Sequence, residues 1–362
     1  MGKPLHKAGL TVALLLGACA GGEDMSETYG PPRYALEDCW RVALIDFESG
    51  DPVRGAEDMA LDLEGGRLFI SAYDRRAVEQ AARKNREAPP HGGVYAVSLD
   101  TLFDPQTDNV TVSSLAAPKD FAGGLRPHGL SYDAKNQELV FINRSYRRDG
   151  RRWRMTPHLR RIGANGEMFV GAPAPAHCAA NDVAADDSKV VTTFDHASCG
   201  IGAGLENVFR LKRSGVADED GPVFSKAAYA NGIARLAEDE LAVAATRESA
   251  ILLLKNSDDG LVEGGRIALP GRPDNLTLAE DGKLVVALHP SLSKLASARK
   301  LGLGKAPSRI VEADVSTGAV NLLFEDPKAA LFSAATAAVE TAQGLIAGSV
   351  IDEGLLVCRA DA

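Results

Sequence analysis

One pattern recurs along this chain: a polar residue near the start of a short strand, a turn, and then an apolar strand. In its clearest copy, Asn181-Asp182 opens the first strand, Asp186–Lys189 forms the turn, and Val190–Phe194 follows. The copies are centred on positions 57, 128, 181, 231 and 274, which are 71, 53, 50 and 43 residues apart. A loose period near roughly 40–50 residues is typical of the blades of a β-propeller.

The other predicted strands complete six blades, which begin near residues 56, 127, 180, 229, 273 and 333. The last blade, over residues 333–358, has only three strands, and the alternating stretch Trp40–Asp46 supplies the fourth. We therefore predict an all-β domain over residues 37–362: a six-bladed β-propeller with four-stranded blades, closed by the N-terminal strand.

Two insertions interrupt the predicted blades. Residues 75–90 have a helical composition, and residues 292–305 have helical spacing at Leu295, Ala298 and Leu301. The first insertion is predicted to form either a surface helix or a lid over the mouth of the ring.

The composition is that of an ordinary soluble globular protein, and the charge excludes one class of partner. With 25% charged and 45% hydrophobic residues, the 362-residue chain can bury a large core in one domain. The net charge of −9 argues against a nucleic-acid partner, because phosphate binding needs a basic face. The basic run Arg147–Arg152 is interpreted as a solvated loop.

Residues 1–18 have the features of a targeting segment. Lys3 and Lys7 precede the apolar run Leu10–Leu16, which is shorter than the roughly 20 residues that span a bilayer. We therefore predict a signal peptide and export from the cytoplasm.

The end of this segment, Leu16-Gly17-Ala18-Cys19, resembles a bacterial lipobox, in which the cysteine is lipidated. The alternative is simple secretion, with Ala18-Cys19-Ala20 as an Ala-x-Ala-like cleavage site. We predict a lipoprotein in the bacterial periplasm or outer membrane, whose only membrane contact is a lipid anchor at Cys19. Residues 19–36, with Gly21-Gly22 and Pro31-Pro32, are predicted to be a flexible tether.

Export makes disulfides possible. Besides Cys19, the chain has four cysteines: Cys39, Cys178, Cys199 and Cys358. An even number in an oxidising compartment indicates two bonds. Cys39 and Cys358 lie at the two ends of the ring, where a bond would close it. Cys178 and Cys199 flank a predicted hairpin, so they form either a cross-strand bridge or two free thiols.

The polar residues that open the predicted blades would meet in the central channel. They are Glu57, His128, Asn181, Asn231, Asp274 and Asn275. Two carboxylates and three carboxamides form an oxygen-only set, which suits Ca²⁺ and its six to eight oxygen ligands. Each dipeptide alone is also a common turn sequence. Their shared register at the blade starts favours a metal site.

The same residues resemble the paraoxonase–arylesterase family, over about residues 37–360. The resemblance rests on Gly55-Ala56-Glu57-Asp58, Pro127-His128-Gly129-Leu130, Asn181-Asp182, Ala230-Asn231-Gly232-Ile233, Asp274-Asn275, His289-Pro290 and the terminal Cys39 and Cys358. It implies a six-bladed propeller with two Ca²⁺ ions, and lactonase or aryl esterase activity. The implied catalytic-ion ligands are Glu57, Asn181, Asn231, Asp274 and Asn275. The implied structural-ion ligands are Asp58, Asp182 and the main-chain carbonyl of Leu130.

The resemblance also suggests how hydrolysis would proceed. Ca²⁺ would polarise a carbonyl, and His128 would activate water, since histidine titrates near neutrality. A hydrogen-bonded core histidine is the alternative for His128. The predicted catalytic group is His128, Asn181, Asp195 and Arg144.

One residue departs from the family's pattern. Arg144 stands where the family has a second histidine, in Asn143-Arg144-Ser145. Because arginine stays charged, it cannot shuttle a proton. We expect Arg144 to pair with Asp195 and to lower the pKa of His128.

Three functions follow from these residues. The first is a calcium-dependent hydrolase of lactones, aryl esters or both, acting on a small molecule as an expected monomer. The second is a non-enzymatic propeller, stabilised by calcium, that binds a partner at the channel mouth. The third is a hydrolase of the gluconolactonase or phosphotriesterase type.

Overall fold

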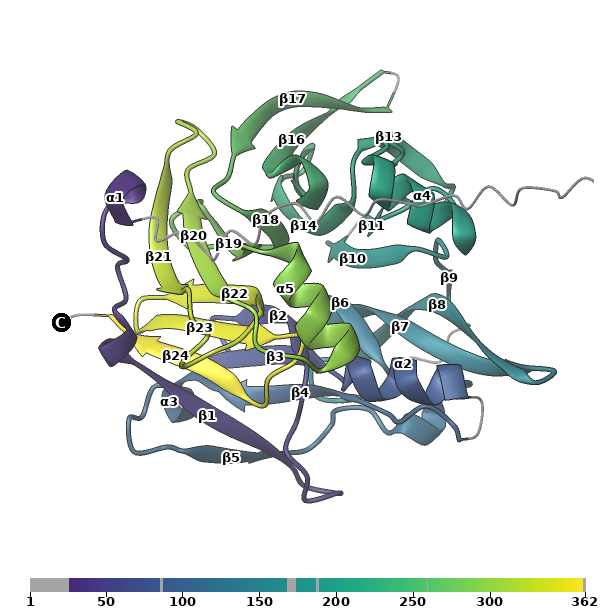
Figure 1. Cartoon of the computed structure of the whole chain (residues 1–362), viewed down its shortest axis with the longest axis horizontal. Coiled ribbons are helices and arrows are strands. Elements are labelled where there is room, and N and C mark those ends of the chain that lie inside the picture. Colours follow the sequence, from purple (N-terminus) through teal and green to yellow (C-terminus); the bar gives the residue numbers. More distant parts are fainter. Residues whose placement is uncertain (1–25, 85–86, 168–173, 187–188, 259, 361–362) are drawn as a thin grey trace, which may run out of the picture.

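A computed structural model describes residues 26–84, 87–167, 174–186, 189–258 and 260–360. Six β-sheets surround a central axis, and their first strands β2, β6, β10, β14, β18 and β22 contact one another in this order and back to β2 (Figure 1). This arrangement confirms the predicted six-bladed β-propeller. The hydrophobic core lies largely between neighbouring blades, as where Val42 and Val357 of the last blade pack with Leu68 of the first.

Four of the blades have four strands each. Their strands are β6 (Pro127–Asp133), β7 (Glu138–Asp149), β8 (Arg152–Gly163) and β9 (Ala174–Pro175); β10 (Ala180–Ala185), β11 (Val190–Phe194), β12 (Ser214–Ala217) and β13 (Pro222–Ala227); β14 (Ala230–Ala237), β15 (Glu240–Ala245), β16 (Ala250–Ser257) and β17 (Gly260–Ala268); and β18 (Arg272–Leu278), β19 (Leu284–His289), β20 (Ser308–Ala313) and β21 (Val320–Asp326). The β10–β11 hairpin has the predicted pairing; residues 187–188 of its turn lie outside the described residues.

The first and last blades differ from the four-strand rule. The first holds three strands, β2 (Ala56–Asp62), β3 (Arg67–Ala72) and β4 (Gly93–Ser98), and the last holds five, β22 (Ala335–Thr341), β23 (Gly344–Ser349), β24 (Leu355–Arg359), β1 (Cys39–Asp46) and β5 (Asn109–Val112). The blade starts predicted near residues 56 and 127 would place Asn109–Val112 in the first blade. Instead β5 pairs in parallel with β1, where it covers the outer edge of the last blade.

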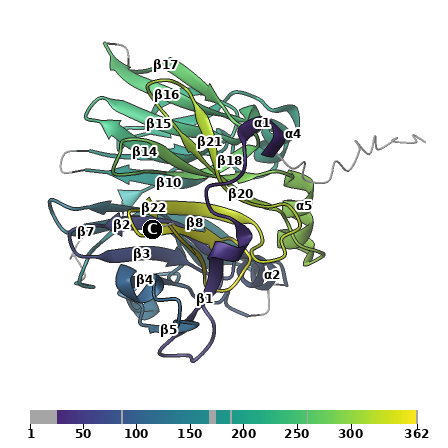
Figure 2. The same ribbon diagram turned by 90° about the vertical axis from the view of Figure 1, so that its left-hand side faces the viewer.

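The N-terminal strand closes the ring as predicted. Strand β1 (purple) runs antiparallel to the yellow C-terminal strand β24, with Cys39 opposite Cys358 in the ladder (Figures 1 and 2). A disulfide joins these two cysteines, and a second joins Cys178 to Cys199. The structure therefore selects the bridged alternative for the hairpin cysteines.

The described end of the predicted tether packs against the ring. Residues 26–36 include helix α1 (Ser26–Tyr29), and Tyr34 is only 3% exposed. The main-chain nitrogens of Arg33 and Tyr34 donate to Leu322 and Leu323 of β21, and Tyr34 Oη donates to Glu340 at 2.7 Å. An aromatic side chain and paired backbone hold this segment on the ring. The signal segment and Cys19 lie outside the described residues.

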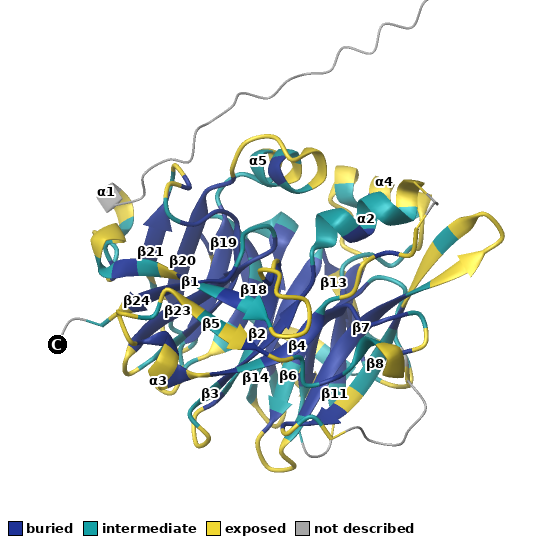
Figure 3. Ribbon diagram, turned by 90° about the horizontal axis from the view of Figure 1, so that it is seen from below, coloured by how far each residue is buried: buried dark blue, intermediate teal, exposed yellow. Residues whose placement is uncertain are grey.

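Three helical segments lie on one face of the ring (Figure 3). Helix α2 (Arg75–Lys84) and helix α5 (Leu292–Ala296), which continues as η4 (Ser297–Leu301), are the two predicted insertions; helix α4 (Ile201–Phe209) is the third. The remaining short helices are α3 (Leu99–Leu102), η1 (Leu36–Asp38), η2 (Pro118–Asp120) and η3 (Thr246–Glu248). No helix of the described residues is long and apolar enough to cross a membrane.

Candidate functional site

A β-bulge explains why polar residues recur at the start of each blade. The pairing of every first strand with its second strand shifts register at the same place, between Ala56/Asp58, Pro127/Leu130, Ala180/Val183, Ala230/Ile233, Pro273/Leu276 and Ala335/Ala337. A bulge bends the strand and re-aims a side chain. The residues inside the bulges are Glu57, His128 with Gly129, Asn181 with Asp182, Asn231 with Gly232, Asp274 with Asn275, and Thr336.

Two of the motif glycines let neighbouring blades approach closely. A Cβ at Gly129 would lie 2.4 Å from the Cα of Asp182, and one at Gly232 would lie 2.6 Å from the Cα of Asn275. No side chain tolerates these distances, so glycine is required for close backbone approach. His128-Gly129 and Asn231-Gly232 therefore each supply a polar side chain and the space that the next blade needs.

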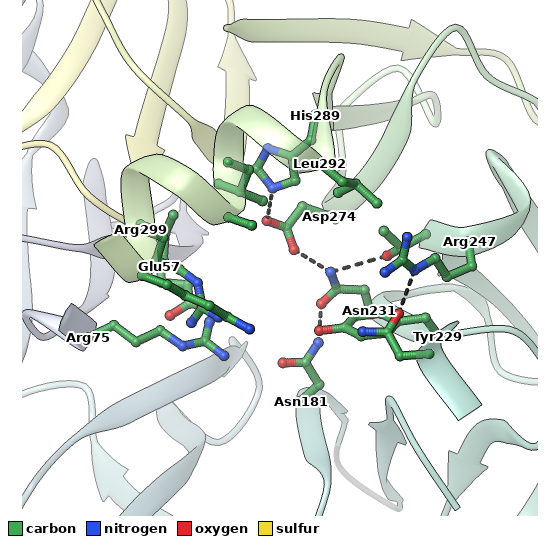
Figure 4. Close-up of a pocket in the computed structure, with 16 residues that line it drawn as sticks. Glu57, Arg75, Asn181, Tyr229, Asn231, Arg247, Asp274, His289, Leu292 and Arg299 are labelled. Carbon is green, nitrogen blue, oxygen red and sulfur yellow. Dashed lines mark hydrogen bonds and ion pairs between the residues drawn. The ribbon is translucent and has the colours of Figure 1, made fainter. Parts of the chain in front are cut away.

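The structure brings the predicted residues of five blades into one chain of contacts. His128 Nδ1 lies 2.9 Å from Glu57 Oε2, and His128 Nε2 lies 2.6 Å from Asn181 Oδ1. The Asn181 amide contacts Asn231 Oδ1, and the Asn231 amide contacts Asp274 Oδ1 (Figure 4).

Two further contacts extend this chain. Asp274 Oδ2 lies 2.6 Å from His289 Nε2, so His289 fixes the orientation of the carboxylate. Asn275 Nδ2 donates to the main-chain oxygen of Glu57 at 2.8 Å, which links the fifth blade to the first.

These side chains suit a hard cation. Glu57, Asn181, Asn231 and Asn275 are each less than 10% exposed, and Glu57 Oε2 faces His128 Nδ1 at 2.9 Å. Buried carboxylate and amide oxygens are the kind of ligand that Ca²⁺ prefers. Among the described residues no three His, Cys, Asp or Glu side chains gather as a metal site, so an ion here would depend on the amide oxygens. One cation is already close, because Arg75 Nη1 lies 2.6 Å from Glu57 Oε1.

Asp58 and Asp182, the proposed structural ligands, lie next to each other in the interior. Asp58 accepts hydrogen bonds from the main-chain nitrogens of Met59 and Leu130, at 2.9 and 2.6 Å. Asp182 accepts from those of Val183 and Ile233, at 2.7 and 2.8 Å. Both carboxylates thus join adjacent blades. Leu130 contacts Asp58 through its main-chain N–H group, whereas the predicted calcium ligand is its main-chain carbonyl.

Burial perturbs this carboxylate pair. Desolvation raises the pKa of both Asp58 and Asp182, and each is raised further by a neighbouring carboxylate, Glu57 for Asp58 and Asp58 for Asp182. Two adjacent buried carboxylates repel each other unless a proton or a cation lies between them. The pair is therefore also suited to Ca²⁺.

His128 lies beneath the oxygen-bearing residues and does not line the cavity above them. It is 2% exposed. Burial and the nearby positive charge of Arg144 lower its pKa to about 4, against the opposing effect of Glu57. The imidazole is therefore neutral near pH 7, as expected from the position of Arg144.

The expected pair between Arg144 and Asp195 does not form. Arg144 is buried, and its guanidinium lies 3.2 Å from Tyr73 Oη and 3.4 Å from Asn181 Oδ1. Asp195 instead lies 2.6 Å from Nδ1 of its neighbour His196. The carboxylate of Asp195 therefore has its partner in His196, the next residue of the chain.

A cavity of about 160 Å³ opens above Asn181, Asn231 and Asp274 (Figure 4). The described residues that line it are Glu57, Arg75, Asn181, Asn207, Tyr229, Asn231, Thr246, Arg247, Asp274, His289, Leu292, Leu295, Ala296, Arg299, Lys300 and Val350. Both helical insertions contribute, so they border the channel mouth.

The sequence analysis did not identify several of the residues that line the cavity. Arg75 and Arg299 come from the insertions, and Arg247 comes from η3 after the second strand of its blade. Tyr229 lies two residues before the predicted ligand Asn231 and has φ of 65°, a conformation that non-glycine residues adopt rarely and that clusters at functional sites. Its position before Asn231 was the only available sequence signal.

Comparison with known proteins gives no family. No family model matches the chain, and no curated protein matches it. The solved structures that resemble it in fold include the following three. A protein of unknown function from Bacteroides caccae has 13% identity and a TM-score of 0.46, with 77% of this chain and 85% of that chain covered. A protein titled a gluconolactonase has 14% identity and a TM-score of 0.44, covering 86% and 90%. The periplasmic gluconolactonase of Pseudomonas aeruginosa has 10% identity and a TM-score of 0.45, covering 81% and 77%. Because each TM-score is below 0.5, nothing about function is drawn from these likenesses.

Proposed function

We propose that this protein is a calcium-dependent hydrolase of lactones, aryl esters or both. The observation that carries the proposal is the convergence of the oxygen-bearing side chains Glu57, Asn181, Asn231, Asp274 and Asn275 from four blades, and four of these side chains line the cavity. Such a set fits Ca²⁺, which when bound would polarise a substrate carbonyl and stabilise negative charge on its oxygen.

The chain's own residues would prepare this centre and the substrate. His289 holds Asp274 through a 2.6 Å contact, which keeps the carboxylate turned toward Asn231. Leu292, Leu295 and Val350 give the cavity an apolar part. An apolar wall limits the access of bulk water and strengthens electrostatic interactions within the site.

His128 is the proposed general base. Its neutral imidazole has a lone pair that can accept a proton, and such assistance is typically worth about 10²–10⁴ in rate. Both of its nitrogens, however, face oxygens of Glu57 and Asn181. The same contacts support a purely positioning role, and substitution by glutamine separates the two roles.

The ion pair between Arg75 and Glu57 favours a second candidate, a propeller that binds its partner without catalysis. An arginine 2.6 Å from a proposed calcium ligand supplies positive charge in place of an ion. In that case Arg75→Met should destabilise the ring by leaving Glu57 buried without a cationic partner.

A hydrolysis panel with and without calcium tests the main proposal. Purified protein is offered γ- and δ-lactones, phenyl acetate, aldonolactones and a phosphotriester, in 1 mM CaCl₂ or in excess EGTA. We expect calcium-dependent turnover of at least one lactone or aryl ester, and its loss in Asp274→Ala. Turnover of aldonolactones alone would favour the gluconolactonase type. No turnover of any substrate would favour the non-catalytic propeller.

We also propose that the protein is exported and lipid-anchored at Cys19. The two disulfides support export, because such bonds persist in oxidising compartments. In a bacterial host, metabolic labelling with a palmitate analogue should mark the wild-type protein and not Cys19→Ser. Labelling of neither protein would instead indicate simple secretion.

A further inference from the structure

We propose that the substrate of this site is a small anion: a lactone or ester that carries a carboxylate, with Arg247 as the residue that binds this group. The inference rests on the proposed hydrolase function and adds to it the class of substrate. Four observations support it: the charge of the cavity wall, the free Nη1 and Nη2 groups of Arg247, the absence of an ion pair between Arg247 and any acid of the described residues, and the size of the cavity.

The cavity wall has more positive than negative side chains. Arg75, Arg247, Arg299 and Lys300 line it, against the two carboxylates Glu57 and Asp274. A bound Ca²⁺ would add further positive charge. A cavity with an excess of one sign favours ligands of the opposite sign.

Two of the arginines are already engaged with acids. Arg75 lies 2.6 Å from Glu57, and Arg299 Nη1 lies 2.8 Å from Glu79 Oε1 on helix α2. Arg75 Nε also lies 3.6 Å from Glu79. The Arg299–Glu79 pair joins the two helical insertions at the channel mouth. Because Arg75 and Arg299 are both paired with acids, Arg247 is the better anchor for a ligand.

Arg247 is held in place and still has free donors. Its main-chain nitrogen donates to the Ala228 oxygen at 3.1 Å, and its Nε donates to Asn207 Oδ1 at 2.5 Å. Nη1 and Nη2 have no hydrogen-bond partner among the described residues, and the side chain lines the cavity (Figure 4). A guanidinium fork with free N–H groups matches the two oxygens of a carboxylate.

No acid of the described residues forms an ion pair with Arg247. Its charged neighbours include Arg210 and Arg272, whose positive charges, after burial, lower the pKa of Arg247. A partly buried guanidinium beside two others is unfavourable without a counter-anion. A ligand carboxylate would supply that anion.

The position of Arg247 and the size of the cavity limit the ligand. Thr246, its neighbour in the chain, accepts a hydrogen bond from the Asn231 amide at 3.3 Å, so the anchor lies close to the proposed ion centre. A cavity of about 160 Å³ is similar to the engineered cavity of about 150 Å³ that holds benzene. We expect one small ring or short chain between carboxylate and reacting carbonyl.

The corresponding reaction balances with water alone. Water adds to the lactone carbonyl of 5-oxotetrahydrofuran-2-carboxylate, and the ring C–O bond breaks. The product is a hydroxydicarboxylate, and one proton is released to solvent. That proton provides the assay, and the matched neutral substrate is 5-oxotetrahydrofuran-2-carboxamide.

Binding is tested without catalysis. Tetrahydrofuran-2-carboxylate and its carboxamide, neither of which has a lactone carbonyl, are titrated into wild type, Arg247→Met and Arg247→Lys by ligand-observed NMR. Charged hydrogen bonds of this kind are worth about a 10- to 100-fold change in affinity. We expect the wild type to prefer the carboxylate by that factor. The variant Arg247→Met should lose the preference, and Arg247→Lys should keep part of it. The control Arg152→Met removes an exposed charge from the β7–β8 hairpin and should change nothing.

The outcomes separate this inference from the proposed function. Preference for the carboxylate in binding, with no hydrolysis of either lactone or of any substrate in the panel, would support the anion site and overturn the hydrolase. Hydrolysis of both lactones with equal kcat/KM, and equal binding of the two probes by wild type, would overturn the anion site alone. Should Arg247→Met fail to fold, the wild-type preference and its loss in 0.5 M NaCl still decide the matter.

Discussion

Gly232 offers a direct test of how the blades position the site. Replacing it by alanine would place a Cβ 2.6 Å from the Cα of Asn275, and 2.8 Å from both the Asp274 oxygen and the Leu276 nitrogen. All three neighbours are backbone atoms, so no side chain can swing away to relieve the clash. A normal contact needs 3.4 Å or more. The start of β18 must therefore move by about 0.8 Å, the difference between 3.4 and 2.6 Å.

This displacement would affect stability and chemistry together. Overpacking a tight interior typically costs about 1–3 kcal/mol, which should appear as a lower free energy of unfolding in urea. Asp274 and Asn275 would move with the backbone, and a displacement near 1 Å in a positioned group can lower the rate about 100-fold. We expect Gly232→Ala to lose both stability and most of its kcat/KM.

The matched control is Gly204→Ala. Gly204 lies in helix α4, and a Cβ there would meet nothing within 4 Å. Alanine should raise the free energy of unfolding by about 0.5–1 kcal/mol, because it favours the helix, and leave activity unchanged. Wild-type stability and activity in Gly232→Ala would refute the close approach of the fourth and fifth blades.

Two further predictions concern calcium and ring closure. Removing calcium with EGTA should lower the melting temperature as well as activity. An ion at a hundredfold excess over its Kd stabilises the folded state by about 2.7 kcal/mol. An unchanged melting curve would contradict a structural ion between Asp58 and Asp182. The double substitution of Cys39 and Cys358 by serine should lower the free energy of unfolding by about 2–5 kcal/mol, because the bond closes a loop that spans 319 positions. Urea unfolding with the Cys178–Cys199 bridge intact measures this loss, and a change below 0.5 kcal/mol would argue that the β1–β24 pairing alone closes the ring.

The architecture could be predicted because each blade repeats one local arrangement. A polar residue in a bulge, followed by a turn and an apolar strand, is a local pattern, and its spacing reveals the ring. The sixth copy was missed because Thr336, in Ala335-Thr336-Ala337, is neither a carboxylate nor an amide. The Oγ1 atom of Thr336 is nevertheless buried, with no hydrogen bond to any residue that the structure describes.

Other features depend on contacts between distant parts of the chain. The Arg299–Glu79 pair joins residues 220 positions apart, and nothing in either insertion indicates the other. Likewise, β5 joins the last blade because β1 leaves an edge to cover, and Tyr34 packs because β21 and Glu340 lie beside it. The cationic cavity wall belongs to this group, since Arg75, Arg247 and Arg299 come from three separate segments.

The role of His128 can be separated from that of the metal ligands. Asp274→Ala removes a charged ligand and should abolish hydrolysis of every substrate. His128→Gln should keep any bound calcium, because imidazole is not in the proposed ligand set, although it removes the 2.9 Å contact with Glu57. If His128 is the base, the loss should be about 10²–10⁴-fold for lactones, which have poor alkoxide leaving groups, and smaller for activated aryl esters.

The variant Arg144→His tests the same role of His128 through an expected gain of lactonase activity. A histidine here would replace a fixed charge, which lies 3.4 Å from Asn181 and lowers the pKa of His128, by a group that can exchange protons. We expect higher lactonase activity in Arg144→His, and no such gain in the double variant with His128→Gln. Calcium titration by calorimetry checks that each variant retains its ions. Full lactonase activity in His128→Gln, with calcium affinity unchanged, would show that His128 only positions Glu57 and Asn181.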